Sequence, residues 1–154
     1  GLRSRRRPAE EADVTVGITY GTFDLFHIGH LRILERTRAL CDRLVVGVST
    51  DEFNALKGKR TAVPFHDRAS IVSALRCVDE VIPEESWDQK QGDITRHSVD
   101  LLVMGDDWRG KFDDLADLCE VVYLPRTPGI STTELRGHVV ELTANGAFAV
   151  VTQG

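Results

Sequence analysis

Apolar runs and amphipathic stretches alternate along this chain from residue 14 onward. Nearly continuous apolar runs predict buried strands over residues 14–20, 44–49, 78–82, 101–104 and 121–124. The stretches between them predict helices over residues 28–40, 67–75, 88–97 and 113–118. A last helix is predicted to open at Ser131, which forms a capping-box pattern with Glu134, and to end at Asn145-Gly146.

This alternation predicts an α/β fold, with a doubly wound five-stranded parallel sheet and helices on both faces. Ligands bind such sheets at the carboxyl ends of the strands, near the point where the strand order reverses. The unusual residues of the chain follow its predicted strands, over residues 22–30, 49–51, 105–108 and 126–133. We therefore expect one active site at that edge of the sheet.

The composition fits one globular domain, which we place at residues 14–146 of 154. Residues 1–13 are predicted to be a flexible lead, and residues 147–154 an apolar tail that could pair with a sheet edge, pack in an oligomer or lead into another domain. The net charge of -5 argues against a general nucleic-acid binder, and no apolar run approaches the roughly 20 residues that span a bilayer. Three widely spaced cysteines and no visible secretory signal predict a cytoplasmic protein with reduced thiols.

The segment Gly21-Thr22-Phe23-Asp24-Leu25-Phe26-His27-Ile28-Gly29-His30 joins the first predicted strand to the first predicted helix. Its histidines therefore lie at a helix start, where unpaired N–H groups and the helix dipole favour anions. Two imidazoles three residues apart can hold a phosphate while charge builds on it. Two alternatives stay open: a metal site made of Asp24, His27 and His30, or a capping histidine beside a surface histidine.

A second candidate anion site is Arg126-Thr127-Pro128-Gly129-Ile130-Ser131-Thr132-Thr133. A glycine and three hydroxyls at a helix N-terminus offer N–H and O–H donors, and the guanidinium of Arg126 suits phosphate oxygens. Taken alone, the same pattern is ordinary helix capping. Further cations follow the second strand and could either serve phosphates or be solvated: Lys57, Lys59, Arg60, Arg68 and Arg76.

Asp106 and Asp107 directly follow the fourth predicted strand. Carboxylates there could bind magnesium, accept a hydrogen bond from the amino group of a base, or cap a turn. Trp87 and Trp108 could line a pocket, or belong to the core or to an interface.

Two motifs in this order and spacing, His27-x-Gly29-His30 and residues 126–133, resemble the cytidylyltransferase family of HxGH nucleotidyltransferases. The segments Arg76-x-Val78-Asp79-Glu80-Val81-Ile82 and 104–113 are similar to its bacterial glycerol-3-phosphate branch, which makes CDP-glycerol for teichoic-acid-type polymers. The likeness runs from about residue 16 to residue 141. It implies a Rossmann-like fold, a homodimer, and Mg2+ that acts together with CTP.

The resemblance implies transfer of CMP from CTP to glycerol 3-phosphate, giving CDP-glycerol and pyrophosphate by direct in-line attack. Catalytic contacts to the phosphates are assigned to His27, His30, Lys57 and Arg126. Nucleotide binding is assigned to Gly21, Thr22, Phe23, Asp24, Gly29, Arg76, Asp107, Ser131, Thr132 and Thr133. We expect the acceptor around Arg68, Trp87 and Trp108, and we assign no residue of the protein as a metal ligand.

Three alternatives stay open at this point. The acceptor could be ribitol 5-phosphate, phosphoethanolamine or phosphocholine. The nucleotide could be ATP, as in an adenylyltransferase of the same superfamily. The chain could also be a nucleotide-binding domain of a larger bifunctional protein, and release of pyrophosphate would separate an enzyme from such a binding module.

Overall fold

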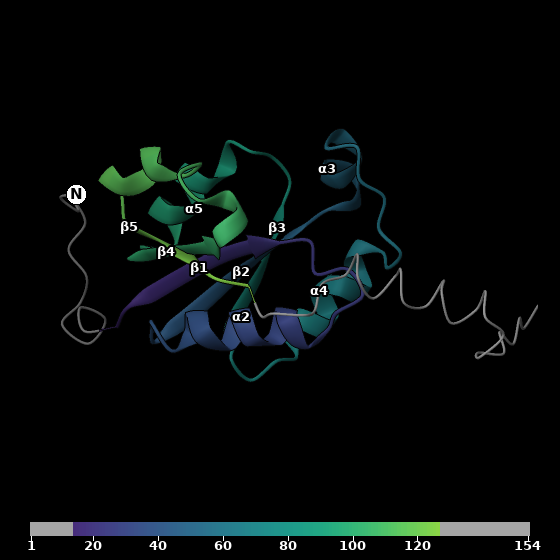
Figure 1. The fold of residues 1–154 in the computed structure, drawn as a ribbon, viewed down its shortest axis with the longest axis horizontal. Helices are drawn as coiled ribbons and strands as arrows, with labels where there is room; N and C mark the ends of the chain where they lie inside the picture. The colour runs from purple at the N-terminus through teal and green to yellow at the C-terminus, as the bar shows by residue number, and fades with distance from the viewer. Residues whose placement is uncertain (1–13, 127–154) are drawn as a thin grey trace, which may run out of the picture.

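The predicted apolar runs form one parallel sheet of five strands, in the order β3-β2-β1-β4-β5 (Figure 1). The structure is a computed structural model, and it describes residues 14–126. Its strands are β1 (Val16–Gly21), β2 (Arg43–Ser49), β3 (Glu80–Glu84), β4 (Leu101–Gly105) and β5 (Glu120–Leu124). The prediction of a doubly wound parallel sheet is thereby confirmed.

The strand order reverses between β1 and β4, because the chain winds outward through β2 to β3 before it returns to β4. Strand β1 pairs with β2 along its whole length, from Val16 to Gly21. Its pairing with β4 covers Gly17 and Ile18 and ends three residues before β1 does. Strands β1 and β4 are therefore not paired at their carboxyl ends, which is where doubly wound proteins bind their ligands.

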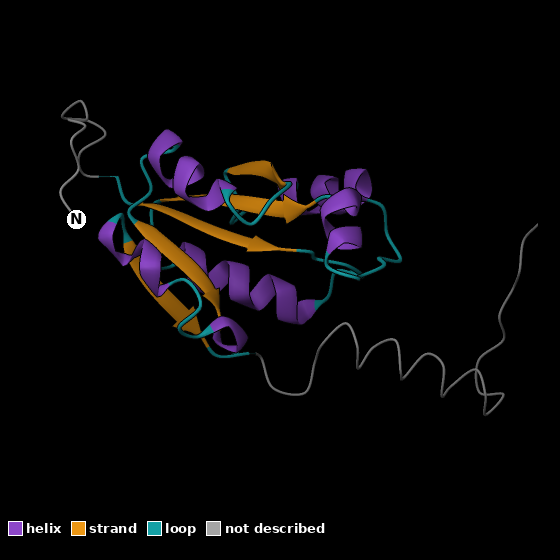
Figure 2. Cartoon of the chain, turned by 90° about the horizontal axis from the view of Figure 1, so that it is seen from above, coloured by secondary structure: helices purple, strands orange, loops and turns teal. Residues whose placement is uncertain are grey.

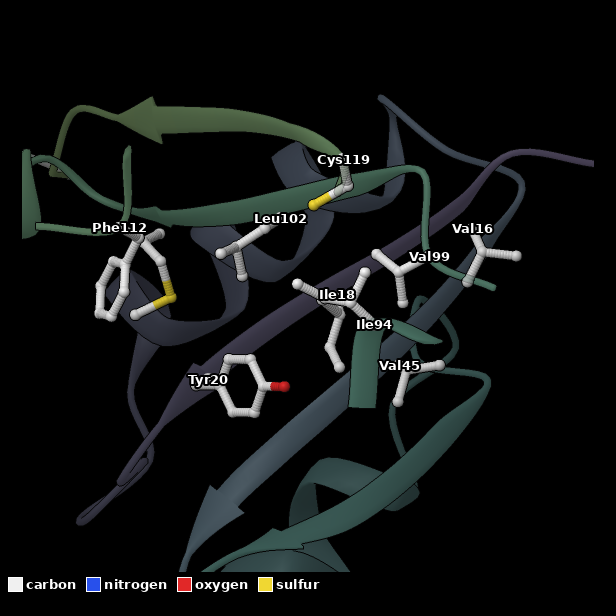
Figure 3. Packing of buried hydrophobic residues seen from close by; sticks show 10 residues of the cluster. Val16, Ile18, Tyr20, Val45, Ile94, Val99, Leu102, Phe112 and Cys119 are labelled. Carbon is white, nitrogen blue, oxygen red and sulfur yellow. The ribbon is translucent and has the colours of Figure 1, made fainter. Parts of the chain in front are cut away.

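Helices cover both faces of the sheet, as predicted (Figure 2). Neighbouring residues of β2 pack on opposite faces: Val46 joins a cluster with Leu34 of α2 (Ile28–Arg38) and Val72 of α4 (Phe65–Ser73). Val45 joins the other cluster with Ile94 of α5 (Gln89–Arg96), as Figure 3 shows. Burial on both faces explains why the strands read as continuous apolar runs rather than alternating ones.

Some elements differ from the prediction. The sequence pattern does not predict α3 (Asp51–Leu56), a six-residue helix whose N-cap Thr50 accepts a hydrogen bond from the Phe53 N–H group. Helix α4 begins two residues early, directly after Pro64, whose fixed φ suits a helix start. Strand β3 begins two residues late and continues through Pro83, which is tolerated because β3 is an edge strand.

Two short 3-10 helices complete the described part of the fold. The stretch predicted as a helix over residues 113–118 is a 3-10 helix, η2 (Asp113–Asp117), and a second one, η1 (Asp106–Trp108), follows β4. No helix within residues 14–126 is both long and apolar enough to cross a membrane. The predicted lead, the helix from Ser131 and the tail lie outside the described residues.

Candidate active site

The loop between β1 and α2 holds the first motif in a tightly packed shape. Phe23 and Leu25 adopt positive φ angles of 55° and 48°, a conformation that costs a non-glycine residue about 1–3 kcal/mol. The Phe23 ring folds back over Gly21, where an added Cβ would lie 2.8 Å from that ring. The same ring packs edge-on against His30, with ring centroids 5.5 Å apart. Gly21 and Phe23 therefore shape the loop that supports His30.

His27 and His30 cap helix α2 and fix each other's orientation. The Gly29 N–H group donates to Nδ1 of His27 at 3.0 Å, and the His27 N–H group donates to Nδ1 of His30 at 3.2 Å. The two rings stack with their centroids 3.8 Å apart. Because Nδ1 accepts a hydrogen bond in each ring, the proton of each neutral imidazole resides on Nε2. Capping and phosphate binding are thus compatible, since Nδ1 serves the helix and Nε2 carries the donor.

The surroundings of His30 favour its neutral form. Burial, followed by the neighbouring His27, lowers the pKa of His30 to about 4, against an opposing effect of Asp24. Near neutral pH the His30 ring is therefore a hydrogen-bond donor rather than a cation.

Asp24 joins the motif to the segment that follows α3. Its carboxylate accepts the N–H groups of Ala62 and Val63, each at 2.9 Å, and the residue is buried. The hypothesis of a metal site with His27 and His30 gains no support, because residues 14–126 contain no group of three His, Cys, Asp or Glu that could hold a metal ion. In this structure Asp24 holds the loop between α3 and α4, which we call the basic loop for its residues Lys57, Lys59 and Arg60, against the histidine motif.

Arg68 is buried, at 1% exposure, beneath the loops of this edge. Its Nε donates to the Val63 carbonyl at 2.8 Å, and Nη1 donates to the carbonyls of Thr22 at 2.8 Å and Ser49 at 2.7 Å. Its Nη2 donates to Oδ1 of Asp51 at 2.7 Å. The guanidinium thus ties together the motif loop, the end of β2, the start of α3 and the basic loop. Acceptor binding by Arg68 stays a prediction, and these hydrogen bonds favour a structural role.

Lys57 ends α3 beside a group of aromatic side chains. Its Nζ lies 4.4 Å from the centroid of the Phe53 ring and 5.5 Å from that of Trp87. Trp87 is half exposed, and its ring centroid is 5.9 Å from that of Trp108. Burial lowers the pKa of Lys57. The structure therefore brings together one residue assigned to the phosphates and two assigned to the acceptor.

Arg126 and Asp107 meet on the β4–β5 side of the switch point, the place between β1 and β4 where the strand order reverses. Arg126 follows β5, Asp107 follows β4, and their side chains form an ion pair that is more than half exposed. Arg36 of α2 donates to the carbonyl of Pro125 at 3.0 Å, which ties the start of the second motif to the helix that carries His30. The other assigned residues of that motif lie outside the described residues: Ser131, Thr132 and Thr133.

Arg76 lies away from the edge of the sheet that holds the other assigned residues. It is on the connection from α4 to β3, at the amino end of the strands, and lines a cavity of about 570 Å³ together with Leu31 and Glu35 of α2. Within one chain the structure does not bring Arg76 to the edge that holds His27 and Lys57. Its assignment to the nucleotide stays a prediction.

Several residues of this edge are missed by the sequence reasoning. Glu84 and Lys90 form a buried polar network next to Lys57, together with Ser49, which the sequence places among the residues of this edge without a role. Asn54, also buried, accepts a hydrogen bond from the Thr22 hydroxyl at 3.3 Å. The one available signal is Thr50 followed by acidic residues, which is typical of a helix start and points to α3. Pairing between charges far apart in the sequence leaves no such signal.

A doubly wound parallel sheet with paired histidines at its switch point, and a lysine among aromatic rings beside them, defines a nucleotide-binding protein of the Rossmann-like class. The sequence profile of the family described as Cytidylyltransferase-like matches residues 18–138. The chain therefore belongs to the cytidylyltransferase-like family.

Two relatives are similar to the chain over nearly all of their own length. The glycerol-3-phosphate cytidylyltransferase of Bacillus subtilis (strain 168) is 57% identical over 125 residues, which cover 81% of this chain and 97% of that protein. The one of Staphylococcus aureus (strain NCTC 8325 / PS 47) is 50% identical over 119 residues, covering 77% of this chain and 90% of that protein. Among solved structures, the lipopolysaccharide core biosynthesis protein from Thermoplasma volcanium GSS1 has a similar fold, with a TM-score of 0.64 and 24% identity over 74% of this chain and 98% of that one.

Proposed function

We propose that this chain transfers CMP from CTP to glycerol 3-phosphate, forming CDP-glycerol and pyrophosphate. The observation that carries the proposal is the 57% identity to the Bacillus subtilis glycerol-3-phosphate cytidylyltransferase over nearly the whole of that protein. The paired histidines and Lys57 at the carboxyl edge of the sheet support it, because they supply donors and a cation where a triphosphate would bind.

The proposed reaction is a single displacement at phosphorus. A phosphate oxygen of glycerol 3-phosphate attacks the α-phosphorus of CTP, and the bond from that phosphorus to the oxygen bridging toward the β-phosphate breaks. Pyrophosphate leaves with the bonding electrons. A phosphate monoester is largely ionised near pH 7, so the attacking oxygen needs no general base. Catalysis then consists of positioning the two substrates in line and stabilising charge.

The residues of the site divide this work. The Nε2–H groups of His27 and His30 would donate to oxygens of the α-phosphate, whose negative charge builds in the transition state. Lys57 would neutralise substrate phosphate from the side of β2, and Arg126 would hold the leaving pyrophosphate from the side of β5. We extend the second role to Ser131, Thr132 and Thr133, on the family resemblance alone.

Magnesium would enter with the nucleotide. Asp106 and Asp107 are each paired with an arginine, Arg109 and Arg126 respectively. Within the described residues no larger group of ligating side chains could form a metal cage. These residues fit a Mg2+ ion that would be held mainly by the phosphates of CTP and by water, with at most one protein carboxylate, as is common for Mg2+. Bound there, the ion would offset the charge of the phosphates.

The proposal extends to the acceptor pocket and to the assembly. Trp87 lies beside Lys57, Trp108 lies next to Trp87, and both rings would line the space for the alcohol. We also propose a homodimer, on the family resemblance, and light scattering of the purified chain would test it by giving the mass of two chains.

An acceptor panel tests the proposed function. The chain is incubated with CTP and Mg2+ plus glycerol 3-phosphate, ribitol 5-phosphate, phosphoethanolamine or phosphocholine, and pyrophosphate is measured. We expect the highest kcat/KM with glycerol 3-phosphate and little turnover when ATP replaces CTP. A higher kcat/KM with another acceptor or with ATP would replace the proposed substrates, and no pyrophosphate with any of them would leave a binding module.

A further inference from the structure

We propose that the buried network of Ser49, Glu84 and Lys90 is a positioning device that holds the ammonium group of Lys57 toward the substrate phosphates. The inference rests on the proposed function, in which Lys57 neutralises phosphate charge. None of the three network residues touches substrate in this proposal, and all of them act through Lys57.

The network is a directed chain of hydrogen bonds. Register pairs Ser49, at the end of β2, with Glu84, at the end of β3. The Ser49 hydroxyl donates to Oε1 of Glu84 at 2.7 Å, and Nζ of Lys90 donates to Oε2 at 2.7 Å. Nζ of Lys57 donates to the Ser49 oxygen at 3.4 Å. A hydroxyl has one proton, and the Ser49 hydroxyl uses it to donate to Glu84. The lone pairs of the Ser49 oxygen therefore remain to accept the hydrogen bond from Lys57.

Both ends of the network are confined by aromatic rings. Nζ of Lys90 lies 4.4 Å from the ring centroid of Tyr20, 5.2 Å from that of Phe112 and 5.5 Å from that of Trp87. Nζ of Lys57 lies at the same distance, 5.5 Å, from Trp87. The two ammonium groups therefore share one ring, and the Glu84 carboxylate accepts a hydrogen bond from Lys90 directly and is joined to Lys57 through the Ser49 hydroxyl. Lys90 is 3% exposed, so the inner end of the network cannot swing out to solvent without unpacking these rings.

Among the charges around Lys57, Glu84 is the one that favours its ammonium form and raises its pKa. The surrounding cations are Lys59 on the same loop, Lys90 of α5 and Arg68 of α4, and each disfavours the charge of Lys57. Burial lowers the pKa of Lys57 most, and Glu84 of β3 opposes that shift. Loss of the Glu84 charge would leave three cations facing Lys57, so the pKa of Lys57 should fall further.

A purely structural ion pair would not need this arrangement. A buried pair is often no more stabilising than apolar side chains of the same volume. Glu84 and Lys90 are both nearly fully buried, yet the hydrogen bonds continue through Ser49 to Lys57, which lies at the end of α3 near the half-exposed Trp87. The extension to Lys57 is the feature that a structural role leaves unexplained.

Glu84→Gln and Ser49→Ala test the proposal, and Glu85→Gln is the matched control, since Glu85 is the exposed neighbour of Glu84. We expect Glu84→Gln to lower kcat/KM by about 10- to 100-fold, because the lysine is no longer held in place. The alkaline limb of its pH–rate profile should move to lower pH. Ser49→Ala, which keeps both charges, should lower kcat/KM with a smaller shift of that limb, and Glu85→Gln should match the parent protein.

A titration without substrate separates this proposal from the proposed function. NMR of lysine Nζ or Cε groups gives the pKa of Lys57 in the parent protein and in Glu84→Gln, and the proposal requires a lower value in the variant. If the parent protein makes no CDP-glycerol, the proposed function fails whatever this titration gives. If Glu84→Gln does not fold, Ser49→Ala decides. Folded variants with only a lower melting temperature, an unmoved Lys57 pKa and parent-like kcat/KM would overturn the positioning role.

Discussion

Arg68 offers the sharpest test of how this edge of the molecule is built. Its guanidinium makes four hydrogen bonds, three to carbonyl oxygens and one to a carboxylate, at 2.7–2.8 Å. Arg68→Met keeps the length of the side chain and removes every donor. Each lost bond involves a charged group, worth about 1.5–3 kcal/mol, although the variant also avoids burying a charge. We expect a net loss of about 3–5 kcal/mol in the free energy of unfolding, because four hydrogen bonds are lost at once and the Thr22, Ser49 and Val63 carbonyls lose their donor.

Thermal unfolding and steady-state kinetics measure the consequences. The melting temperature of Arg68→Met should fall by about 10 °C for a domain of this size. Activity should fall with CTP and with the acceptor alike, because the basic loop is no longer tied to the histidine motif. Arg68→Lys should recover only part of the loss, since an ammonium cannot reproduce the guanidinium fork.

Arg43→Met is the control, because Arg43 is half exposed and its pair with Glu80 should be worth no more than about 1 kcal/mol. A parent-like melting temperature for Arg68→Met, together with a raised KM for the acceptor alone, would refute the reasoning. In that case Arg68 would bind the acceptor, as the sequence predicts.

The remaining predictions concern the histidine pair and the core beneath it. His30→Gln should keep the fold, because glutamine at this helix position can still accept a hydrogen bond from the His27 N–H group. Its kcat should fall about 100-fold, because a donor that stabilises charge in the transition state is removed. A parent-like kcat would exclude this role of His30. Because the pKa of His30 is about 4 in the folded state and 6.5 in its ordinary state, the unfolded chain binds more protons between these pH values. The stabilisation due to His30 should therefore be complete above pH 6.5 and be lost as the pH falls toward 4, and urea titrations should show this slope in the parent protein but not in His30→Gln. Gly47→Ala should destabilise the chain by about 1–3 kcal/mol in the same assay, since its Cβ would lie 2.3 Å from the buried Tyr20 ring, whose hydroxyl is anchored on Asp93; an unchanged midpoint would show that this ring moves freely.

The strand pattern and the helix after β1 follow from sequence because their signals are local. Residues 44–48 form an uninterrupted run without a polar side chain, and β2 indeed buries residues on both faces. The histidine motif is equally local, since its spacing places both rings in the first turn of α2. Helix α3 escapes the pattern because six residues are too few to show a helical period.

The parts that sequence reasoning misses depend on distant partners. Glu84 pairs across the sheet with Ser49, 35 residues away, and Arg68 reaches Thr22, 46 residues away. Burial of charged side chains runs against the average for their residue type, so composition favours solvated surface for Arg68 and Lys90. The location of Arg76 at the amino end of the strands is likewise a matter of topology, which its local motif does not encode.

Phosphorus NMR of the complete reaction tests the central claim most directly. Purified chain, CTP, Mg2+ and glycerol 3-phosphate are mixed, and the spectrum is followed in the parent protein and in His30→Gln. We predict that the two diphosphate signals of CDP-glycerol grow in a one-to-one ratio with pyrophosphate, and that His30→Gln is about 100-fold slower. Release of pyrophosphate without CDP-glycerol, or no reaction above that of the variant, would contradict the account.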